Sequence, residues 1–211
     1  MCGRFARTSA IPVFASALGG DPGITATATT VALFTPGMAV TAFRRDPGGH
    51  RISADPLGWG YHPWQAGPKA PTPINARAET AARSAWFRDA FRHRRCLVPA
   101  DGWLEWQADD DGSRQPWYFS HAAGAPLFLA ALWAPRLPPE HPGDGRPADG
   151  LAIVTEPARG AAAAVHPRMP VVLTDRDSLL AWLDPALTHR ADLRRRIRHT
   201  AMDDLRQWPV S

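Results

Sequence analysis

The sequence predicts a single α+β domain with a largely antiparallel, barrel-like β core flanked by helices. Its 211 residues suit one domain and are enough to bury a core. Short apolar segments of strand length follow one another closely, with helical segments between them and no internal repeat. We therefore expect one domain over residues 1–211, interrupted by a Pro/Gly-rich loop at residues 134–150.

The first half of the chain is predicted from its turn residues and apolar spacing. In order, we expect a helical stretch within 1–18, polar turns at 19–30, short strands at 31–43, loops with short strands at 57–75, and a helix at 84–95. Pro36 is expected to break the strands at 31–43. Phe87 and Phe91 give the helix its apolar face.

The second half is richer in continuous apolar runs. We expect a strand, a turn and a strand in CLVPADGWLEW, further strands in PWYFS, LFLAALW, LAIVT and MPVVLT, and helices at 175–183 and 185–199. The last of these helices is strongly basic, and an alanine-rich segment separates the last two strands.

Composition narrows the functional classes. There is no apolar run of 18 residues and no basic segment followed by an apolar stretch, which predicts neither a membrane span nor a secretory signal. Two cysteines do not make a disulfide framework, so a reducing, cytoplasmic location is expected. The net charge is +4 and Lys69 is the only lysine, an arginine bias that suits phosphate binding but also a GC-rich genome.

Cys2 is an unusual position for a chemically useful thiol. It has no neighbouring residues that would complete a metal site, and a residue at a frayed terminus is often a spectator. If Met1 is removed, however, Cys2 carries a free α-amine and a thiol on adjacent carbons. Arg4 and Arg7 follow closely, and we expect them to lower the pKa of that thiol.

Asn75 and Arg77 lie two residues apart in PINARAE. In an extended segment both side chains point to one side, where an amide and a guanidinium together can orient an oxygen-rich anion. The alternative is a helix start, with Asn75 as the N-cap and Arg77 in solvent.

Glu105 lies between tryptophans in a predicted strand. Alternation places Trp103 and Glu105 on one face of that strand, and Leu104 and Trp106 on the other. Burial beside aromatic rings is expected to raise the pKa of the carboxyl group and to suit it to proton transfer. A structural ion pair with an arginine is the alternative.

His166 and Arg168 are also two residues apart, before an apolar strand. The imidazole can move protons near neutral pH, and the guanidinium beside it can hold a phosphate, although a lone histidine is often structural.

Most of the nine tryptophans are expected to pack in cores, but one or two within residues 57–75 offer a face on which a base can stack. Cys96 is expected to be a buried core thiol.

Several segments taken together are more specific than any one of them. The chain resembles the SOS-response-associated peptidase (SRAP) family through MCGRF, GWGYHPW, NARAET, FRDAFRHRRCLVPADGWLEW, QPWYF, ALW, HPRMPVVL and WLDP. The resemblance covers nearly the whole length. It implies the SRAP fold and recognition of abasic sites in single-stranded DNA, to which the family's members link covalently.

The resemblance also implies roles for individual residues. The family's catalytic cysteine, asparagine, glutamate and histidine match Cys2, Asn75, Glu105 and His166. Its DNA-binding residues match Arg4, Arg77, Arg168, Trp64 and Pro36. Two segments depart from the family pattern, Leu33-Phe34-Thr35-Pro36 and Thr155-Glu156-Pro157-Ala158, and Glu156 would add a negative charge where DNA passes.

On this resemblance the expected activity is formation of a thiazolidine crosslink between Cys2 and an abasic site. Such a crosslink would protect the lesion from strand cleavage during the DNA damage response, with autoproteolytic and lyase-type activity as accompaniments. The expected protein is a monomer without cofactor or metal, cytoplasmic and associated with the nucleoid on damaged DNA. Two alternatives are an N-terminal-nucleophile cysteine peptidase or amidase and a non-catalytic single-stranded DNA binder.

Overall fold

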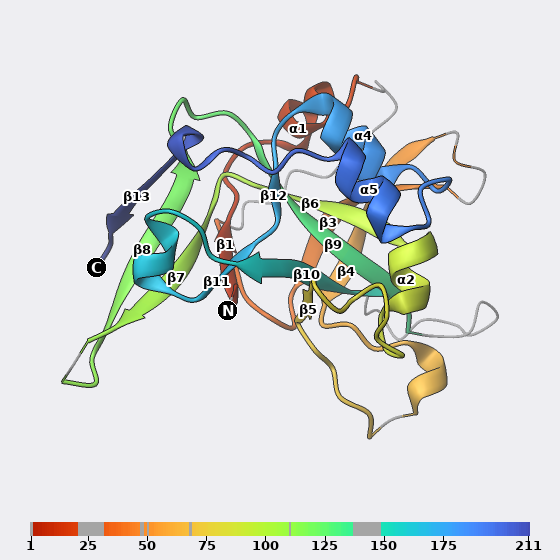
Figure 1. Ribbon diagram of the computed structural model, residues 1–211, viewed down its shortest axis with the longest axis horizontal. Helices are drawn as coiled ribbons and strands as arrows, with labels where there is room; N and C mark the ends of the chain where they lie inside the picture. Colours follow the sequence, from red (N-terminus) through yellow and green to blue (C-terminus); the bar gives the residue numbers. More distant parts are fainter. Residues whose placement is uncertain are drawn as a thin grey trace.

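The strands of the protein form two sheets, with helices packed mainly against one of them (Figure 1). The computed structural model describes residues 2–20, 32–46, 49, 51–67, 69–109, 111–136 and 149–211. Most of the predicted segments at 19–30 and 134–150 therefore lie outside the described residues. The α+β class expected from the sequence is confirmed.

The smaller sheet is antiparallel and has the strand order β13-β8-β7-β1-β2. Its strands are β1 (Arg4–Ala6), β2 (Leu33–Phe34), β7 (Gly102–Ala108), β8 (Arg114–His121) and β13 (Leu205–Pro209). Because β1 lies beside β7, with Arg4 opposite Leu104, the N-terminal residues run next to the strand that carries Glu105.

The larger sheet closes on itself. Its strands are β3 (Ala39–Arg45), β4 (Ile52–Trp59), β5 (Asn75–Arg77), β6 (Arg95–Ala100), β9 (Leu127–Pro135), β10 (Asp149–Pro157), β11 (Arg168–Pro170) and β12 (Val172–Leu173). The ring follows the order β10-β4-β3-β6-β9, in which each strand pairs with the next, and it closes where β9 pairs with β10. Only the β10–β4 and β10–β5 pairs are parallel among the described strands, so the expected barrel-like, largely antiparallel core is confirmed.

The helices are short. They are α1 (Ile11–Ala17), α2 (Arg88–His93), α3 (Ala162–Val165), α4 (Arg176–Leu183) and α5 (Arg190–Arg196), with 3₁₀ turns η1 (Trp64–Ala66) and η2 (Met202–Asp204). The helix expected at 84–95 begins only at Arg88, after a series of turns. The helix expected at 185–199 is wrong at both ends. Its start is delayed because the Asp184 carboxylate accepts a hydrogen bond from the Ala186 N–H. Beyond the end of α5, the Arg198 N–H donates to Ser178 Oγ (2.7 Å), so the helix does not continue.

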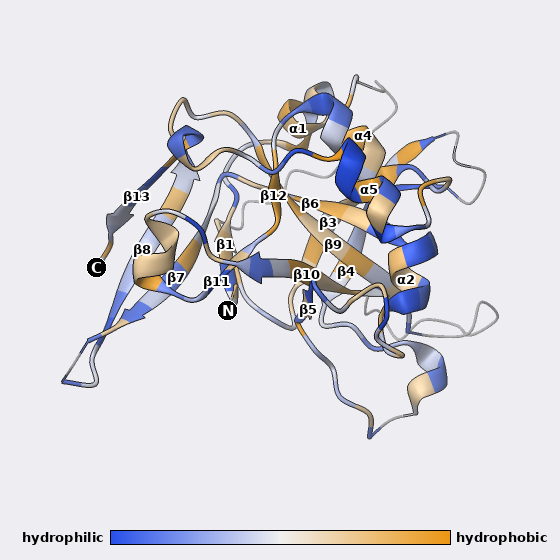
Figure 2. Cartoon of the chain, viewed as in Figure 1, coloured by the Kyte–Doolittle hydropathy of each residue, from blue (hydrophilic) through white to orange (hydrophobic). Residues whose placement is uncertain are grey.

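Side chains of the ring strands point alternately to two apolar clusters, and β6 and β9 are accordingly strongly hydrophobic (Figure 2). On β9, Phe128 faces the cluster beneath the helices, whereas Leu129 faces the cluster that lies toward β1 and β7. A strand buried on both faces is a nearly continuous apolar run, which is the pattern that LFLAALW shows. Cys2 belongs to the second cluster.

Asp101 lies at the predicted turn between β6 and β7, but these strands belong to different sheets. Its carboxylate accepts hydrogen bonds from the Thr8 and Ser9 N–H groups (2.6 and 2.9 Å), which holds the segment after β1 against this crossing. At Gly102 a Cβ would lie 2.2 Å from the Phe119 carbonyl oxygen, so β8 packs closely where only glycine fits. The crossing therefore directs β7 and Glu105 toward β1.

Candidate functional site

Cys2 lies at the point where the two sheets meet. It precedes β1 and is fully buried among apolar side chains. Its carbonyl oxygen accepts a hydrogen bond from Asn75 Nδ2 at 2.9 Å. A residue next to the chain terminus is thus anchored from a strand that is distant in sequence, which is not the frayed terminus of the alternative interpretation.

Burial sets the protonation state of the Cys2 thiol. The expectation that Arg4 and Arg7 lower its pKa is wrong, because burial raises the pKa well above the ordinary value and the charge of Glu105 raises it further. The two arginines are engaged elsewhere, Arg4 over the Trp106 ring and Arg7 over the Phe34 ring. The thiol is therefore protonated at neutral pH.

Glu105 is a buried carboxylic acid beside Cys2. Its side chain and that of Trp103 are on the inner face of β7, as alternation predicted, and Glu105 is 2% exposed. Burial raises its pKa to about 7, and the positive charge of the chain's amino terminus acts in the opposite direction. The expected rise in pKa is confirmed, so this group exchanges a proton readily at neutral pH.

Asn75 and Arg77 lie on β5, which pairs in parallel with β10, so the alternative helix start is wrong. The two side chains flank buried Ala76. Arg77 is exposed, whereas Asn75 points toward Cys2. Asn75 Oδ1 is buried and has no hydrogen-bond partner among the described residues. A buried acceptor without a donor is costly, and at this position it is suited to a donor supplied by a ligand.

His166 follows α3 and is held by the backbone of Arg168. His166 Nδ1 lies 3.0 Å from both the backbone nitrogen and the carbonyl oxygen of Arg168, so either tautomer of the ring makes a hydrogen bond to this backbone. Burial lowers the pKa of the imidazole, so the neutral ring predominates at pH 7. Gln107 Nε2 donates to the Ala164 carbonyl (3.1 Å) and so ties α3 to β7, the strand of Glu105.

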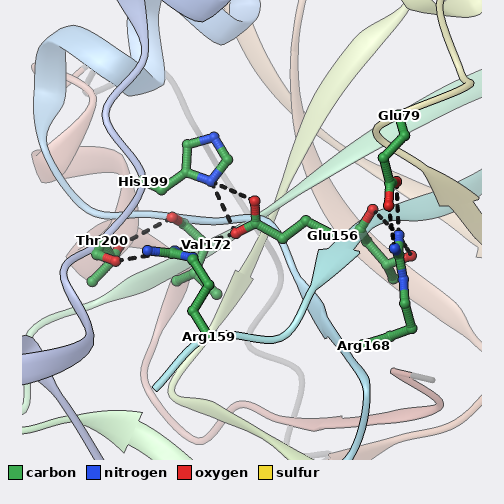
Figure 3. A network of polar contacts seen from close by, with 8 residues as sticks. Glu79, Glu156, Arg159, Arg168, Val172, His199 and Thr200 are labelled. Carbon is green, nitrogen blue, oxygen red and sulfur yellow. Dashed lines mark hydrogen bonds and ion pairs between the residues drawn. The ribbon is translucent and has the colours of Figure 1, made fainter. Parts of the chain in front are cut away.

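Arg168 is fixed by a carboxylate and a strand. Its guanidinium makes a two-point ion pair with Glu79, and Nη2 donates to the Thr155 carbonyl at 2.7 Å (Figure 3). Nothing in the local sequence marks Glu79 as the partner of Arg168, although Glu79 continues the alternation of Asn75 and Arg77 in NARAET. The contact joins residues 89 positions apart.

The remaining predicted DNA-binding residues are exposed but are not all gathered at Cys2. Arg4 lies on β1, with its guanidinium 4.8 Å from the centre of the Trp106 ring, and Pro36 lies in the turn between β2 and β3. Trp64 is 43% exposed on η1, which Figure 1 draws well away from β1.

Glu156 does not present a free charge to the site. It is 9% exposed, and its carboxylate contacts His199 Nδ1 at 2.8 Å and Arg159 Nη2 at 3.2 Å (Figure 3). The negative charge expected in the path of DNA is therefore balanced by Arg159 and hydrogen-bonded by His199. The described residues hold no cluster of His, Cys, Asp and Glu suited to a metal, and none of their helices is long and apolar enough to cross a membrane.

The chain is similar to known sequences of one family. The family model described as SOS response associated peptidase (SRAP) matches residues 1–211. Abasic site processing protein YedK of Escherichia coli (strain K12) is 39% identical over 125 residues, which are 58% of this chain and 52% of that protein. Abasic site processing protein YoqW of Bacillus subtilis (strain 168) is 31% identical over 138 residues, 65% of this chain and 59% of that protein. The matches thus span little more than half the length of these relatives.

Solved structures match over more of the chain. The crystal structure of a phage-related protein from Bordetella bronchiseptica superposes with a TM-score of 0.77 at 32% identity, covering 99% of this chain and 94% of that one. A protein from Bacteroides thetaiotaomicron gives a TM-score of 0.82 at 16% identity, covering 100% and 92%, which shows a shared fold only.

Proposed function

The chain belongs to the SRAP family, and on this premise we propose that it captures abasic sites in single-stranded DNA by forming a covalent crosslink through Cys2 after removal of Met1. One observation carries the proposal. Cys2 is anchored at its carbonyl by Asn75 and lies beside the buried acid Glu105, so a terminal residue occupies the position of a reacting group.

The first step uses the α-amine that Cys2 gains when Met1 is removed. An abasic deoxyribose opens to an aldehyde, and the amine nitrogen attacks its carbon. Loss of water then gives an imine. The oxygen must receive protons to leave, and Glu105, with a pKa of about 7, is suited to deliver them and to take a proton from the α-ammonium group, which frees the amine for attack.

The second step uses the thiol of the same residue. Its sulfur adds to the imine carbon and its proton passes to the nitrogen, which closes a five-membered thiazolidine without any further reactant. Ring closure removes the imine that would otherwise promote β-elimination and strand cleavage. Holding amine, thiol and aldehyde together supplies much of the rate as effective concentration.

Two further groups assist. His166 is neutral at pH 7, which suits the imidazole to make a hydrogen bond to the sugar as the ring opens and to carry a proton to the thiazolidine in slow reversal. The free acceptor of Asn75, Oδ1, suits a hydroxyl or N–H group of the linkage. Both roles are hydrogen-bonding roles that a buried site strengthens.

The DNA strand is bound by cations and rings that lie outside the buried centre. We assign flanking phosphates to Arg4, Arg77 and Arg168, and contacts with the bases and sugars to Trp64 and Pro36. The protein would act in the cytoplasm as a monomer of one domain, residues 1–211, on nucleoid DNA, shielding the lesion from cleavage during the damage response.

The peptidase alternative needs a thiolate nucleophile, and the raised pKa of the Cys2 thiol disfavours it in the chain that retains Met1. Cleavage of the Met1–Cys2 bond by the same site is compatible with the proposal. Lyase-type cleavage would follow only if the imine escaped ring closure.

The test is a denaturing gel of purified protein mixed with single-stranded DNA that bears one abasic site. Mass spectrometry first establishes that Met1 is absent. We expect a covalent band that requires both the lesion and Cys2 and is lost in Cys2→Ala. The matched control is Cys96→Ala, which removes the other buried thiol and should retain the band. A band that persists in Cys2→Ala, or none with the mature protein, would refute the proposal.

A further inference from the structure

We infer that the pocket between β10 and α5 binds one nucleotide of the DNA strand that flanks the abasic site. This inference rests on the proposed function and extends it to a subsite beyond the crosslinking centre. The pocket has a volume of about 190 Å³ and is lined by residues of β10, α4 and α5 and by Ala78 and Glu79, which follow β5.

The floor and the mouth of the pocket differ in chemistry. Its floor includes the apolar side chains of Phe91, Val154 and Trp182, which are buried in the cluster beneath the helices. Its mouth is charged and includes Glu79, Glu156, His199, Arg190 and Arg194. An apolar floor below a charged mouth suits a ligand with a flat apolar part and an anionic part, which is the composition of a nucleotide.

Two of the cations at the mouth of the pocket are available to bind a ligand. Glu79 is paired with Arg168, and Glu156 with Arg159 and His199 (Figure 3). Arg190 and Arg194 of α5 have no ion-pair or hydrogen-bond partner within the part of the chain that the structure describes. Since both acidic groups are neutralised, the pocket presents two uncompensated guanidinium groups, which favour a phosphate.

The pocket adjoins two of the arginines assigned to flanking phosphates. Arg77 lies on β5 opposite Thr155 of β10, and the next residue, Ala78, donates its N–H to the Thr155 carbonyl at 2.8 Å. Arg168 contacts that same carbonyl and also Glu79, which lines the pocket. A strand whose phosphates meet Arg77 and Arg168 is thereby directed toward Arg190 and Arg194.

The volume of the pocket limits which part of the DNA strand it can bind. Pockets for drug-sized ligands measure about 300–1,000 Å³. A volume of about 190 Å³ is below that range, so it fits one base rather than a dinucleotide. The base would lie on the apolar floor, with its phosphate at the two arginines.

The test compares two double variants that remove the same charge from the same helix. Arg190→Ala/Arg194→Ala alters the mouth of the pocket, whereas Arg195→Ala/Arg196→Ala alters residues that line a separate pocket beside α4. Binding of an undamaged single strand of about 15 nucleotides, near the upper end of known site sizes, is measured by fluorescence anisotropy over a range of salt concentrations. This binding does not depend on the Cys2 chemistry, so its failure is distinct from failure of the crosslink.

We expect the first double variant to bind about tenfold more weakly than the wild type, with a salt dependence shallower by about 1.4, or ~0.7 for each phosphate that is no longer neutralised. The control variant should keep the wild-type affinity within about twofold. Abasic strands are also trimmed stepwise from either end, and crosslinking of each strand is compared between the wild type and the first double variant. Below one strand length, and for trimming from one end only, the two proteins should crosslink equally well. Equal effects of the two double variants, or a difference that survives trimming on both sides, would overturn the inference.

Discussion

Replacing Glu105 by Gln should make the protein more stable and less active at the same time. Gln has nearly the shape of the protonated carboxylic acid but cannot ionise. In the folded protein burial raises the pKa of Glu105 from its ordinary value of 4.5 to about 7. The folded state therefore binds a proton between these pH values that the unfolded state has released, and stability from this group is lost as the pH rises from 4.5 to 7.

The magnitude follows from that difference. Each pKa unit corresponds to about 1.36 kcal/mol, so ionised Glu105 costs the fold on the order of 3 kcal/mol above pH 7. Glu105→Gln should match the wild type near pH 4.5 and exceed its free energy of unfolding by about 3 kcal/mol at pH 8. At this chain length that is a rise of roughly 6–12 °C in Tm.

Urea denaturation of both proteins at several pH values measures the effect. Other groups titrate in the same window, among them His166, and those that do not interact with Glu105 contribute equally to both proteins and cancel in the difference. Crosslinking by the variant should be slower by about 10²-fold or more, because the proton carrier is gone. If the stability difference does not change between pH 4.5 and 8, Glu105 is not a buried acid with a raised pKa. If the crosslinking rate is unchanged, Glu105 does not carry the proton.

Three further substitutions test separate contacts. Asn75→Ala removes the hydrogen bond to the Cys2 carbonyl and should slow crosslinking about tenfold or more in a gel time course; an unchanged rate would count against anchoring. Gly102→Ala places a Cβ against the Phe119 carbonyl and should cost about 3 kcal/mol in urea denaturation, whereas a neutral effect would contradict the close packing of β8. Trp64→Ala should weaken single-strand binding by ~1–3 kcal/mol in anisotropy titrations, and equal affinity would exclude stacking on that ring.

Alternation along a strand could be predicted well from the sequence. The facing of Trp103 and Glu105 and the apolar β9 depend on local periodicity, and local periodicity is visible in a sequence. The raised pKa of Glu105 followed from the same facing. The three-residue strand of Asn75 and Arg77 is too short to show a period, so the sequence left a helix start open there.

Contacts between distant segments could not be predicted. The turn at Asp101 has the same local chemistry whether its strands pair with each other or, as here, enter different sheets. The helix expected at 185–199 is shortened by a hydrogen bond to Ser178, and the pKa of the Cys2 thiol is governed by burial rather than by arginines nearby in sequence. Glu79 acquires its importance only through Arg168.

Borohydride treatment of the crosslinked product tests the central claim most directly. An imine between the Cys2 amine and the sugar is reduced and gains hydrogen, whereas a closed thiazolidine is not. We expect the wild-type adduct to keep its intact mass after borohydride and its DNA strand to stay uncut. Cys2→Ser, which offers the amine without the thiol, should give a reducible adduct and strand cleavage. A wild-type adduct that is reduced by borohydride would contradict ring closure by the Cys2 thiol.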